Sequence, residues 1–202
     1  MRVLLIDAFD SFVFVIAQYY EKLGAQTKVV RVNDEPIGQY QQWQPHLLVL
    51  GPGPGTPEEH GYPEIIRTAG DKQAIFGVCL GHQAIGEFFG WQLNNALTIE
   101  HGKKAQVQHD GKGIFHNVPS SFSVVRYHSL TLTDPGDETD LINTATTEED
   151  WVVMGVRHKT RPIEGVQFHP ESIGTEHGIA IVRNSLRLTN QYVNDEELLP
   201  VF

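Results

Sequence analysis

The stretch "IFGVCLGHQAIGEFF" (residues 75–89) joins a short apolar run to a helical pattern, and the only cysteine of the chain, Cys79, stands at the junction. The apolar run predicts a buried strand over 74–78, and the pattern that follows predicts a helix over 82–90. A strand that leads directly into a helix is the unit from which α/β sheets are built. This junction therefore indicates both the fold class and a candidate site.

The first half of the chain alternates between apolar runs and helical patterns. Its apolar runs are almost uninterrupted, which is typical of parallel strands covered by helices on both faces. The alternation predicts a sheet with right-handed crossovers. Besides the junction at Cys79, the expected strands cover 2–7, 27–32 and 46–51, and the expected helices cover 11–24 and 62–69.

The second half differs, because its apolar runs follow one another without helices between them. Consecutive strands of this kind predict antiparallel pairing. A last helical pattern runs from near Glu176 to about Leu188. The expected strands lie around 104–108, 122–127, 141–146, 152–157 and 163–167. The chain is therefore expected to form an α/β fold with a mostly parallel central sheet and an antiparallel extension.

Length and charge limit the class of protein. The 202 residues suffice for one sizeable core and no Pro/Gly/Ser-rich linker divides them, so we expect one domain, with two domains as the alternative. The formal net charge of -10 argues against general nucleic-acid binding, which needs a basic surface. No apolar run approaches the roughly 20 residues that span a bilayer, so we expect no membrane segment.

Cysteine usage and the first residues bear on the cellular compartment. A single cysteine excludes a disulfide within the chain. The opening "MRVLLID" lacks the pattern of a positively charged, apolar leader. We therefore expect a protein of the reducing cytoplasm.

Residues 77–81, Gly-Val-Cys-Leu-Gly, match the G-x-nucleophile-x-G pattern of a nucleophile elbow. In such a turn the reactive side chain is exposed in a strained conformation, and the flanking glycines permit close packing. The start of the helix stabilises a thiolate on Cys79, and the amide of Leu80 points at the group that the sulfur attacks. The alternative is that Cys79 is a buried small hydrophobic residue.

The segment "GVQFHPES" (residues 165–172) offers the base and the orienting carboxylate that a nucleophile needs. His169 and Glu171 are two positions apart at the end of a predicted strand, so in an extended chain their side chains leave on the same side. A carboxylate beside an imidazole favours its charged form, which favours a thiolate. The alternative is a surface histidine, and the sequence separation does not show that His169 meets Cys79.

The segment "LGPGPGTP" (residues 50–57) directly follows a predicted strand. Its prolines predict a rigid loop, and Gly51, Gly53 and Gly55 can offer exposed backbone amides. Such amides can stabilise a tetrahedral oxyanion. A phosphate cradle is one alternative, although the loop lacks the Lys-Ser/Thr ending of a P-loop and the spacing of a dinucleotide fingerprint. A plain turn is the other.

Taken together, "GPGPGTP", "GVCLGHQAI", "RYHSL" and "GVQFHPES" resemble the signature blocks of class I (triad-type) glutamine amidotransferases. More narrowly, the chain is similar to the small glutaminase subunits of anthranilate synthase and aminodeoxychorismate synthase. The resemblance runs from the first strand to about Leu188. It implies a flavodoxin-like three-layer fold and hydrolysis of the glutamine side-chain amide, with ammonia passed to a synthase that aminates chorismate.

The resemblance also implies a role for each matching residue. Cys79 would attack the amide carbon and form a γ-glutamyl thioester. His169 would protonate the departing ammonia and then activate water, while Glu171 would orient His169. The amides of Leu80 and Gly53 would form the oxyanion hole. The substrate glutamine would be held by Gly53, Pro54, Gly55, Gln83, Ser129 and Leu130.

Partners follow from the same resemblance. It implies that the substrate is L-glutamine and that the partner in a hetero-oligomer is a chorismate-binding synthase subunit. It implies no metal or cofactor in this chain, whereas the synthase would use Mg. The glutaminase domain would cover 1–190, and the acidic segment 191–202 would be a disordered or partner-docking tail. Which aminated product forms, and whether one or two synthases are served, stay open. The alternatives are a stand-alone γ-glutamyl cysteine hydrolase and a non-catalytic regulatory subunit.

The opening block departs from the family pattern. Ala8, Val13 and Val15 stand where the family usually has two asparagines and a threonine. None of the implied catalytic roles falls on these positions, so the departure bears on local hydrogen bonding and on partner contact. In "RYHSL", Tyr127 and His128 are expected to contribute packing or support of the loop.

Overall fold

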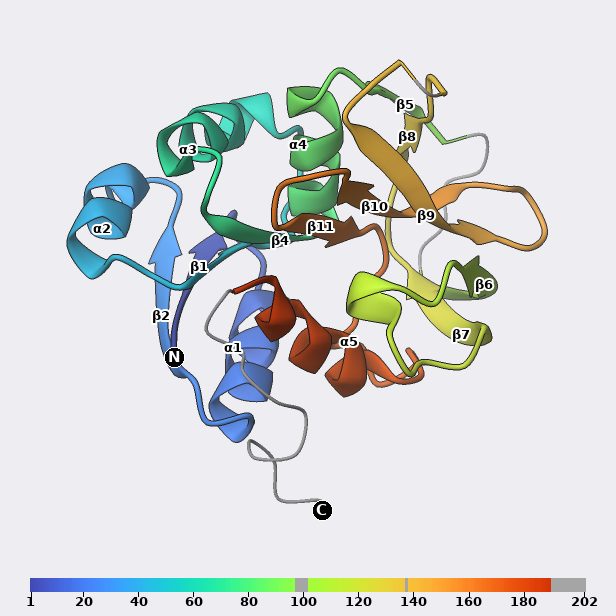
Figure 1. The fold of residues 1–202 in the computed structure, drawn as a ribbon, viewed down its shortest axis with the longest axis horizontal. Coiled ribbons are helices and arrows are strands. Elements are labelled where there is room, and N and C mark those ends of the chain that lie inside the picture. The colour runs from blue at the N-terminus through green and yellow to red at the C-terminus, as the bar shows by residue number, and fades with distance from the viewer. Residues whose placement is uncertain (97–101, 137, 190–202) are drawn as a thin grey trace.

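The computed structural model describes residues 1–96, 102–136 and 138–189 (Figure 1). Its centre is a nine-stranded sheet with the order β2-β1-β3-β4-β11-β10-β9-β6-β7. The strands from β2 to β11 in this order pair in parallel, and those from β11 to β7 pair antiparallel. The predicted α/β fold with a parallel part and an antiparallel extension is confirmed.

The parallel half has the flavodoxin-like order 2-1-3-4, with β11 in the fifth place. Strands β3 and β4 are buried along their whole length, as their uninterrupted apolar sequences predict. Loops after the carboxyl ends of these strands gather at one edge of the sheet. The half consists of β1 (Arg2–Asp7), β2 (Gln26–Arg31), β3 (Leu47–Leu50), β4 (Ala74–Val78) and β11 (Ile163–Val166).

The antiparallel half continues the sheet from β11. Its strands are β10 (Val153–His158), β9 (Leu141–Thr147), β6 (Lys103–His109) and β7 (Ser121–Arg126). A separate two-stranded sheet joins β5 (Gln92–Asn95) to β8 (Leu130–Thr133). These two strands were not predicted, because β5 has one apolar residue in four and β8 alternates, so neither has the uninterrupted apolar run that marks β3.

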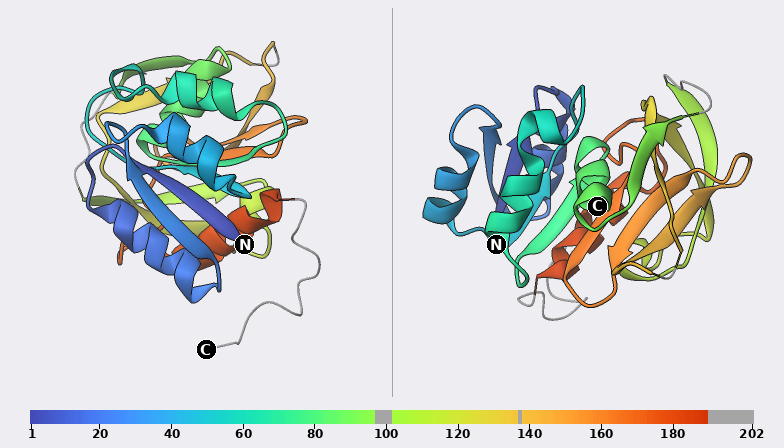
Figure 2. Two further views of the ribbon diagram at one scale, coloured as in Figure 1. Left: turned by 90° about the vertical axis from the view of Figure 1, so that its left-hand side faces the viewer. Right: turned by 90° about the horizontal axis from the view of Figure 1, so that it is seen from above.

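Helices cover both faces of the parallel half (Figures 1 and 2). One face carries α1 (Phe12–Lys22) and α5 (Gly178–Ser185), whose apolar side chains share a core with β1, β3 and β4. The other carries α2 (Pro36–Trp43), α3 (Tyr62–Ala69) and α4 (Leu80–Phe88), and α3 and α4 contribute to a second core. The three layers agree with the predicted flavodoxin-like architecture. Short 3-10 turns cover Glu58–His60, Gly113–Phe115 and Leu186–Leu188.

Helix α2 is the helix that sequence patterns missed. Its apolar residues Ile37, Tyr40 and Trp43 pack against the second core but are only partly buried, so the helix has just a short, narrow apolar stripe. Within the described ranges, no helix has the length and apolarity needed to cross a membrane.

The predicted domain 1–190 is described up to Thr189. The segment 191–202 lies outside the described residues, so its expected role as a tail stays a prediction.

Candidate active site

Cys79 occupies the turn between β4 and α4, at the carboxyl edge of the sheet. Its backbone angles are φ 52° and ψ -102°, a conformation that residues other than glycine rarely adopt. This is the strained strand-to-helix turn that the sequence pattern predicts. The residue is only 8% exposed, so its neighbours shield the sulfur from most of the solvent.

The two glycines beside Cys79 are required by close contacts. A Cβ atom on Gly77 would lie 2.5 Å from the carbonyl carbon and oxygen of Gly81. A Cβ atom on Gly81 would lie 2.1 Å from the carbonyl oxygen of Leu50, at the end of β3. Both distances are far too short for real Cβ contacts. Glycine therefore lets α4 start directly against β3 and β4.

Strand β11 brings a distant segment to the sulfur. Val166 pairs with Val78 in the parallel β4–β11 ladder, and the Cys79 amide donates to the Val166 carbonyl over 2.9 Å. The residues that follow Val166 therefore emerge beside Cys79. Two of them, Gln167 and His169, are buried there.

His169 and Glu171 form a buried pair, with 2.5 Å between His169 Nδ1 and Glu171 Oε1. The structure brings the two side chains together as expected, but the extended backbone assumed for this contact is wrong. Residues 169–172 form a turn in which the Ser172 amide donates to the His169 carbonyl over 3.2 Å. Pro170 is the second residue of this turn, where the fixed φ of proline is favourable.

The pKa of His169 reflects two opposing effects. Burial lowers it, but the charge of Cys79, a hydrogen bond to Cys79 and the Glu171 carboxylate together raise it well above its ordinary value. Nδ1 is engaged by Glu171, so Nε2 is the nitrogen left to meet the sulfur. The raised pKa favours a positively charged imidazolium beside the sulfur at neutral pH.

The loop over residues 51–57 is fastened through its carbonyl groups. The Tyr62 hydroxyl donates to the Gly51 carbonyl over 2.9 Å. His60 Nε2 donates to the Pro54 carbonyl over 2.7 Å. The loop is thus held in place at Gly51 and Pro54.

Two backbone amides, those of Leu80 and Gly53, are available as donors. Leu80 is the first residue of α4, so its amide has no acceptor inside the helix. The Gly53 amide makes no backbone hydrogen bond within the described part of the chain. A Cβ atom on Gly53 would lie 2.5 Å from the Cβ and carbonyl oxygen of Ala8, so only glycine fits where this loop meets the end of β1.

The residues expected to hold glutamine include a connected group beside α4. Gln83 is 3% exposed, and its Nε2 donates to the Leu130 carbonyl over 3.2 Å. Ser129 is exposed, and its carbonyl accepts from the Ala96 amide over 2.8 Å. The "RYHSL" segment is thereby held against both α4 and the end of β5.

Gln167 is a member of this group to which the sequence patterns gave no role. It is fully buried, its Nε2 donates to Cys79 Sγ over 3.6 Å, and its Oε1 accepts from Gln83 Nε2 over 3.0 Å. A polar residue between Val166 and Phe168, at the end of a buried strand, was the signal that could have indicated it.

His128 supports the same segment. Its Nδ1 donates to the Leu130 carbonyl over 2.9 Å, and its Nε2 accepts from Arg126 Nε over 3.2 Å. Arg126 Nη1 also lies 3.0 Å from Asp150 Oδ2 in an ion pair. Burial, and then the charge of Arg126, lowers the pKa of His128 to about 4, so this imidazole is neutral at pH 7.

Aromatic side chains surround His169 at the surface. Tyr127 and Phe12 present ring edges to its imidazole at centroid distances of 5.4 and 5.9 Å, and both rings are about two-fifths exposed. Tyr127 therefore packs against the base, in line with its expected structural role.

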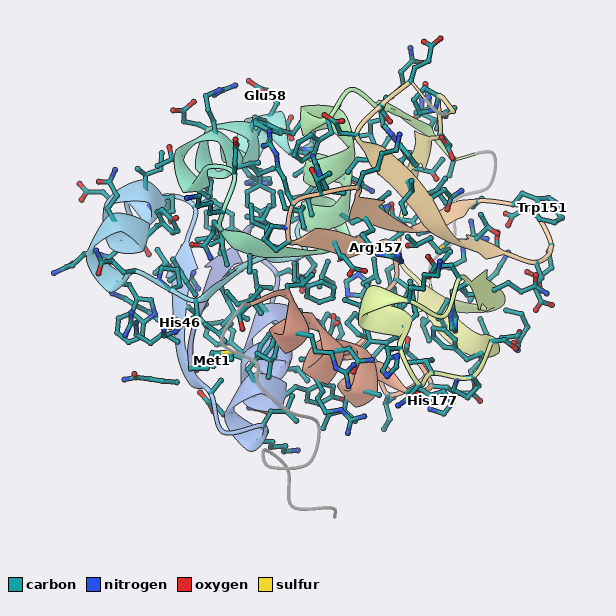
Figure 3. All side chains as sticks on the ribbon, viewed as in Figure 1. Met1, His46, Glu58, Trp151, Arg157 and His177 are labelled. Atoms are coloured by element: carbon teal, nitrogen blue, oxygen red, sulfur yellow. The ribbon has the colours of Figure 1, made fainter. Side chains whose placement is uncertain are left out.

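A further exposed aromatic side chain, Trp151, lies outside this group. It is labelled in Figure 3, projects from the turn between β9 and β10 and is 73% exposed.

The departures in the opening block fall mostly on buried positions. Ala8 and Val13 are fully buried and Val15 is partly buried, so apolar packing occupies these positions. The turn after β1 keeps a hydrogen bond from the Phe12 amide to Asp10 Oδ1, of 2.9 Å. None of the hydrogen bonds of the Cys-His-Glu group uses the changed side chains.

A strained cysteine beside a buried histidine–glutamate pair, on a flavodoxin-like sheet, defines a triad-type cysteine hydrolase or transferase. Residues 4–188 match the family described as glutamine amidotransferase class-I, and the chain therefore belongs to this family.

Relatives narrow the comparison. The chain is 43% identical over 194 residues to anthranilate synthase component 2 of Pseudomonas putida, covering 94% of this chain and 98% of that protein. It is 40% identical over 183 residues to aminodeoxychorismate/anthranilate synthase component 2 of Bacillus subtilis, covering 90% and 94% of the two chains. A crystal structure described as that of a GMP synthase protein from Thermoplasma acidophilum matches with a TM-score of 0.82 and 27% identity, covering 93% of both chains.

Proposed function

We propose that this chain is the glutaminase subunit of a chorismate-aminating synthase. It hydrolyses L-glutamine and delivers the ammonia to a chorismate-binding subunit. The observation that carries the proposal is the buried contact between His169 and Glu171 beside the strained Cys79. The two component 2 relatives, which align over more than nine-tenths of their own length, support the choice of pathway.

The proposed reaction has two stages. The Cys79 thiolate attacks the amide carbon of glutamine, and the resulting tetrahedral intermediate expels ammonia, which takes its proton from His169. This leaves a γ-glutamyl thioester. His169 then removes a proton from water, which attacks the thioester, and glutamate leaves as the thiolate is restored. Glu171 keeps Nε2 of His169 aimed at the reacting atoms throughout.

The oxyanion of both tetrahedral intermediates is assigned to the amides of Leu80 and Gly53. Both are preorganised, one by the start of α4 and the other by the fastened loop, so they need no reorganisation during the reaction. Glutamine is assigned to the loop residues Gly53, Pro54 and Gly55 together with Gln83, Ser129 and Leu130.

No cofactor enters the proposed reaction, because the thiolate, the imidazolium and the two amides supply its nucleophile, its acid and base, and its oxyanion donors. Within the described residues, no group of three or more His, Cys, Asp or Glu side chains is placed to hold a metal ion. We assign Mg to the synthase partner. The exposed rings of Phe12 and Tyr127, at the mouth of the site, form the surface that we assign to partner contact.

The test is glutamine hydrolysis by the purified chain, alone and with a candidate synthase and chorismate. We expect low activity alone, a strong increase with the partner, and a loss of at least about 1,000-fold in Cys79→Ser. The matched control is Ser120→Cys on the Cys79→Ser background, which returns a thiol to an exposed position before β7, without the strained turn, and should not restore activity.

Undiminished ammonia release by Cys79→Ser would refute the nucleophile. Faster cleavage of γ-glutamyl peptides than of glutamine, without dependence on a synthase, would instead favour a stand-alone γ-glutamyl hydrolase.

A further inference from the structure

Cys79 receives a side-chain hydrogen bond that the triad does not account for. Gln167 Nε2 lies 3.6 Å from Cys79 Sγ, within the range for a donor to sulfur, and Gln167 is fully buried. A carboxamide at this place has two possible orientations. One presents N–H to the sulfur and stabilises a thiolate, and the other presents the carbonyl oxygen and destabilises it.

Neighbouring groups select the first orientation. The Leu130 carbonyl can only accept, so Gln83 must present Nε2 to it, over 3.2 Å. The second N–H of that nitrogen points to Gln167 over 3.0 Å and requires an acceptor there, which is Oε1. Gln167 is then left with Nε2 facing the sulfur. The Leu130 carbonyl therefore decides which atom donates and which accepts in each hydrogen bond of this series.

Side chains from the antiparallel half hold that carbonyl. His128 Nδ1 donates to the Leu130 oxygen over 2.9 Å. Arg126 can only donate, and its Nε contacts His128 Nε2 over 3.2 Å, so Nε2 must be the acceptor and Nδ1 must carry the proton. Asp150 anchors Arg126 over 3.0 Å. An unbroken series of hydrogen bonds thus runs from Asp150 to the sulfur.

We propose that Gln167 stabilises the Cys79 thiolate as a hydrogen-bond donor, and that Gln83, His128 and Arg126 are positioning residues that fix its orientation. The proposal rests on the proposed function only in taking Cys79 as the nucleophile. The donor favours the thiolate before attack. It acts again when the thiolate is the leaving group of thioester hydrolysis, and it has little charge to stabilise while the sulfur is acylated.

The first test measures alkylation of the purified chain by iodoacetamide as a function of pH. The chain has one cysteine, so the rate reports on Cys79 alone, and the small neutral reagent needs no glutamine recognition. In Gln167→Leu we expect the midpoint of the profile to move up by about one pH unit, because a hydrogen bond to a charged group is lost. In Gln167→Glu, a carboxylate faces the sulfur, and the midpoint should move further in the same direction.

The matched control is Gln73→Leu, at the other end of β4. Gln73 Nε2 also donates two hydrogen bonds, to the carbonyls of His46 and Ala74, but it is remote from the sulfur. We expect its profile to match that of the parent chain. If Gln167 only fills the core, both leucine variants will lose thermal stability and neither will shift the profile. That result would overturn the proposal, whether or not the chain proves to be a glutaminase.

The second test addresses the positioning residues. His128→Leu removes the donor to the Leu130 carbonyl, whereas His128→Asn keeps an amide N–H near the place of Nδ1. We expect a shift of roughly half a pH unit in the leucine variant and recovery in the asparagine variant. In the double variant with Gln167→Leu the shift should not exceed that of Gln167→Leu alone, because both changes act on one chain of hydrogen bonds. Additive shifts would contradict the positioning role.

Discussion

The parallel half of the sheet brings the reactive side chains together through close backbone packing, whereas the antiparallel half supports them through a series of hydrogen-bonded side chains. On the parallel side, glycines at 77 and 81 let strand ends and a helix start meet at distances that admit no Cβ atom. On the antiparallel side, Arg126 and His128 reach toward the site through a series of polar contacts. Substitutions that add atoms should therefore be most damaging in the parallel half. Substitutions that remove a hydrogen-bond partner should be most damaging in the antiparallel half.

Strand β11 is the last strand of the parallel half and joins it to the antiparallel half, and the largest effect is expected from His169, three residues after the end of β11. His169→Asn removes the acid and base from both stages, and we expect kcat of the complex with its synthase to fall roughly 1,000-fold. The matched histidine control is His46→Asn. His46 directly precedes β3, at the end of the strand away from the site, so this variant should keep near-parental kcat. A loss below tenfold in His169→Asn would assign the proton transfers to another group.

The same residue gives an NMR test of the charge state. The pKa of His169 is raised by Cys79 and by Glu171 against the effect of burial, so it should fall in Cys79→Ser, which removes the negative partner. A raised histidine pKa stabilises the fold at pH values below the unfolded value, and this stabilisation is lost as pH rises through the folded value. As pH rises through the folded-state pKa of His169, the free energy of unfolding should therefore fall more in the parent than in Cys79→Ser. Imidazole titrations that coincide in the two proteins would refute the ion pair.

The next effect concerns the parallel half. Gly81→Ala would place a Cβ atom 2.1 Å from the Leu50 carbonyl oxygen and 2.7 Å from the Leu50 Cβ, and the backbone cannot yield without moving α4 away from β3. We expect the free energy of unfolding to fall by about 3 kcal/mol in urea titrations. Gly38→Ala in α2 is the control, because its nearest neighbour would be 4.0 Å away, and it should be neutral or slightly stabilising. Equal effects in both variants would show that close packing at the turn is not limiting.

These two regions also differ in what the sequence could show. Uninterrupted apolar strands and glycines at fixed offsets are local signals, so the parallel half, the turn at Cys79 and the loop at Gly53 could all be predicted. The series from Asp150 to Gln167 joins residues that are far apart in the chain and whose types are common on surfaces. The Leu130 carbonyl decides which atoms of this series donate and which accept, and no residue spacing in the sequence indicates this.

Where the sequence predictions were wrong or incomplete for single elements, the cause lies within a few residues. The contact of His169 with Glu171 was expected from an extended chain, but Pro170 makes a turn, and the same two side chains meet by another route. Helix α2 has eight residues and buries none of its side chains fully, so its apolar pattern is short. Strand β8 has only two apolar residues, which alternate with threonines, so it lacks the uninterrupted apolar run by which the equally short β3 is recognised.

A smaller effect is expected from a pair that crosses between the two halves. Glu164 on β11 lies 3.4 Å from Arg157 Nε on β10, and burial raises its pKa to about 7 despite that charge. Folding then takes up a proton between pH 4.5 and about 7, so the free energy of unfolding falls as pH rises through this window. The stability difference between Glu164→Gln and the parent should change by about 2 kcal/mol in favour of the variant from pH 4.5 to 8. A stability difference between Glu164→Gln and the parent that does not change with pH would refute the raised pKa.

The smallest effect tests the outer end of the antiparallel series. Asp150→Ala leaves the buried guanidinium of Arg126 without its anion, but the Asp150 side chain is 36% exposed, so solvent screens part of the loss. We expect about 1 kcal/mol of destabilisation and a modest weakening of glutaminase activity, because His128 loses part of its support. The control is Asp134→Ala, because Asp134 accepts from the Gly136 amide in an exposed turn, and this change should have almost no effect on activity. Both variants could keep full activity, with the alkylation profile of Cys79 unchanged in Asp150→Ala. In that case Asp150 and Arg126 would not support the site. The contribution of the antiparallel half would then be limited to His128, which contacts the Leu130 carbonyl.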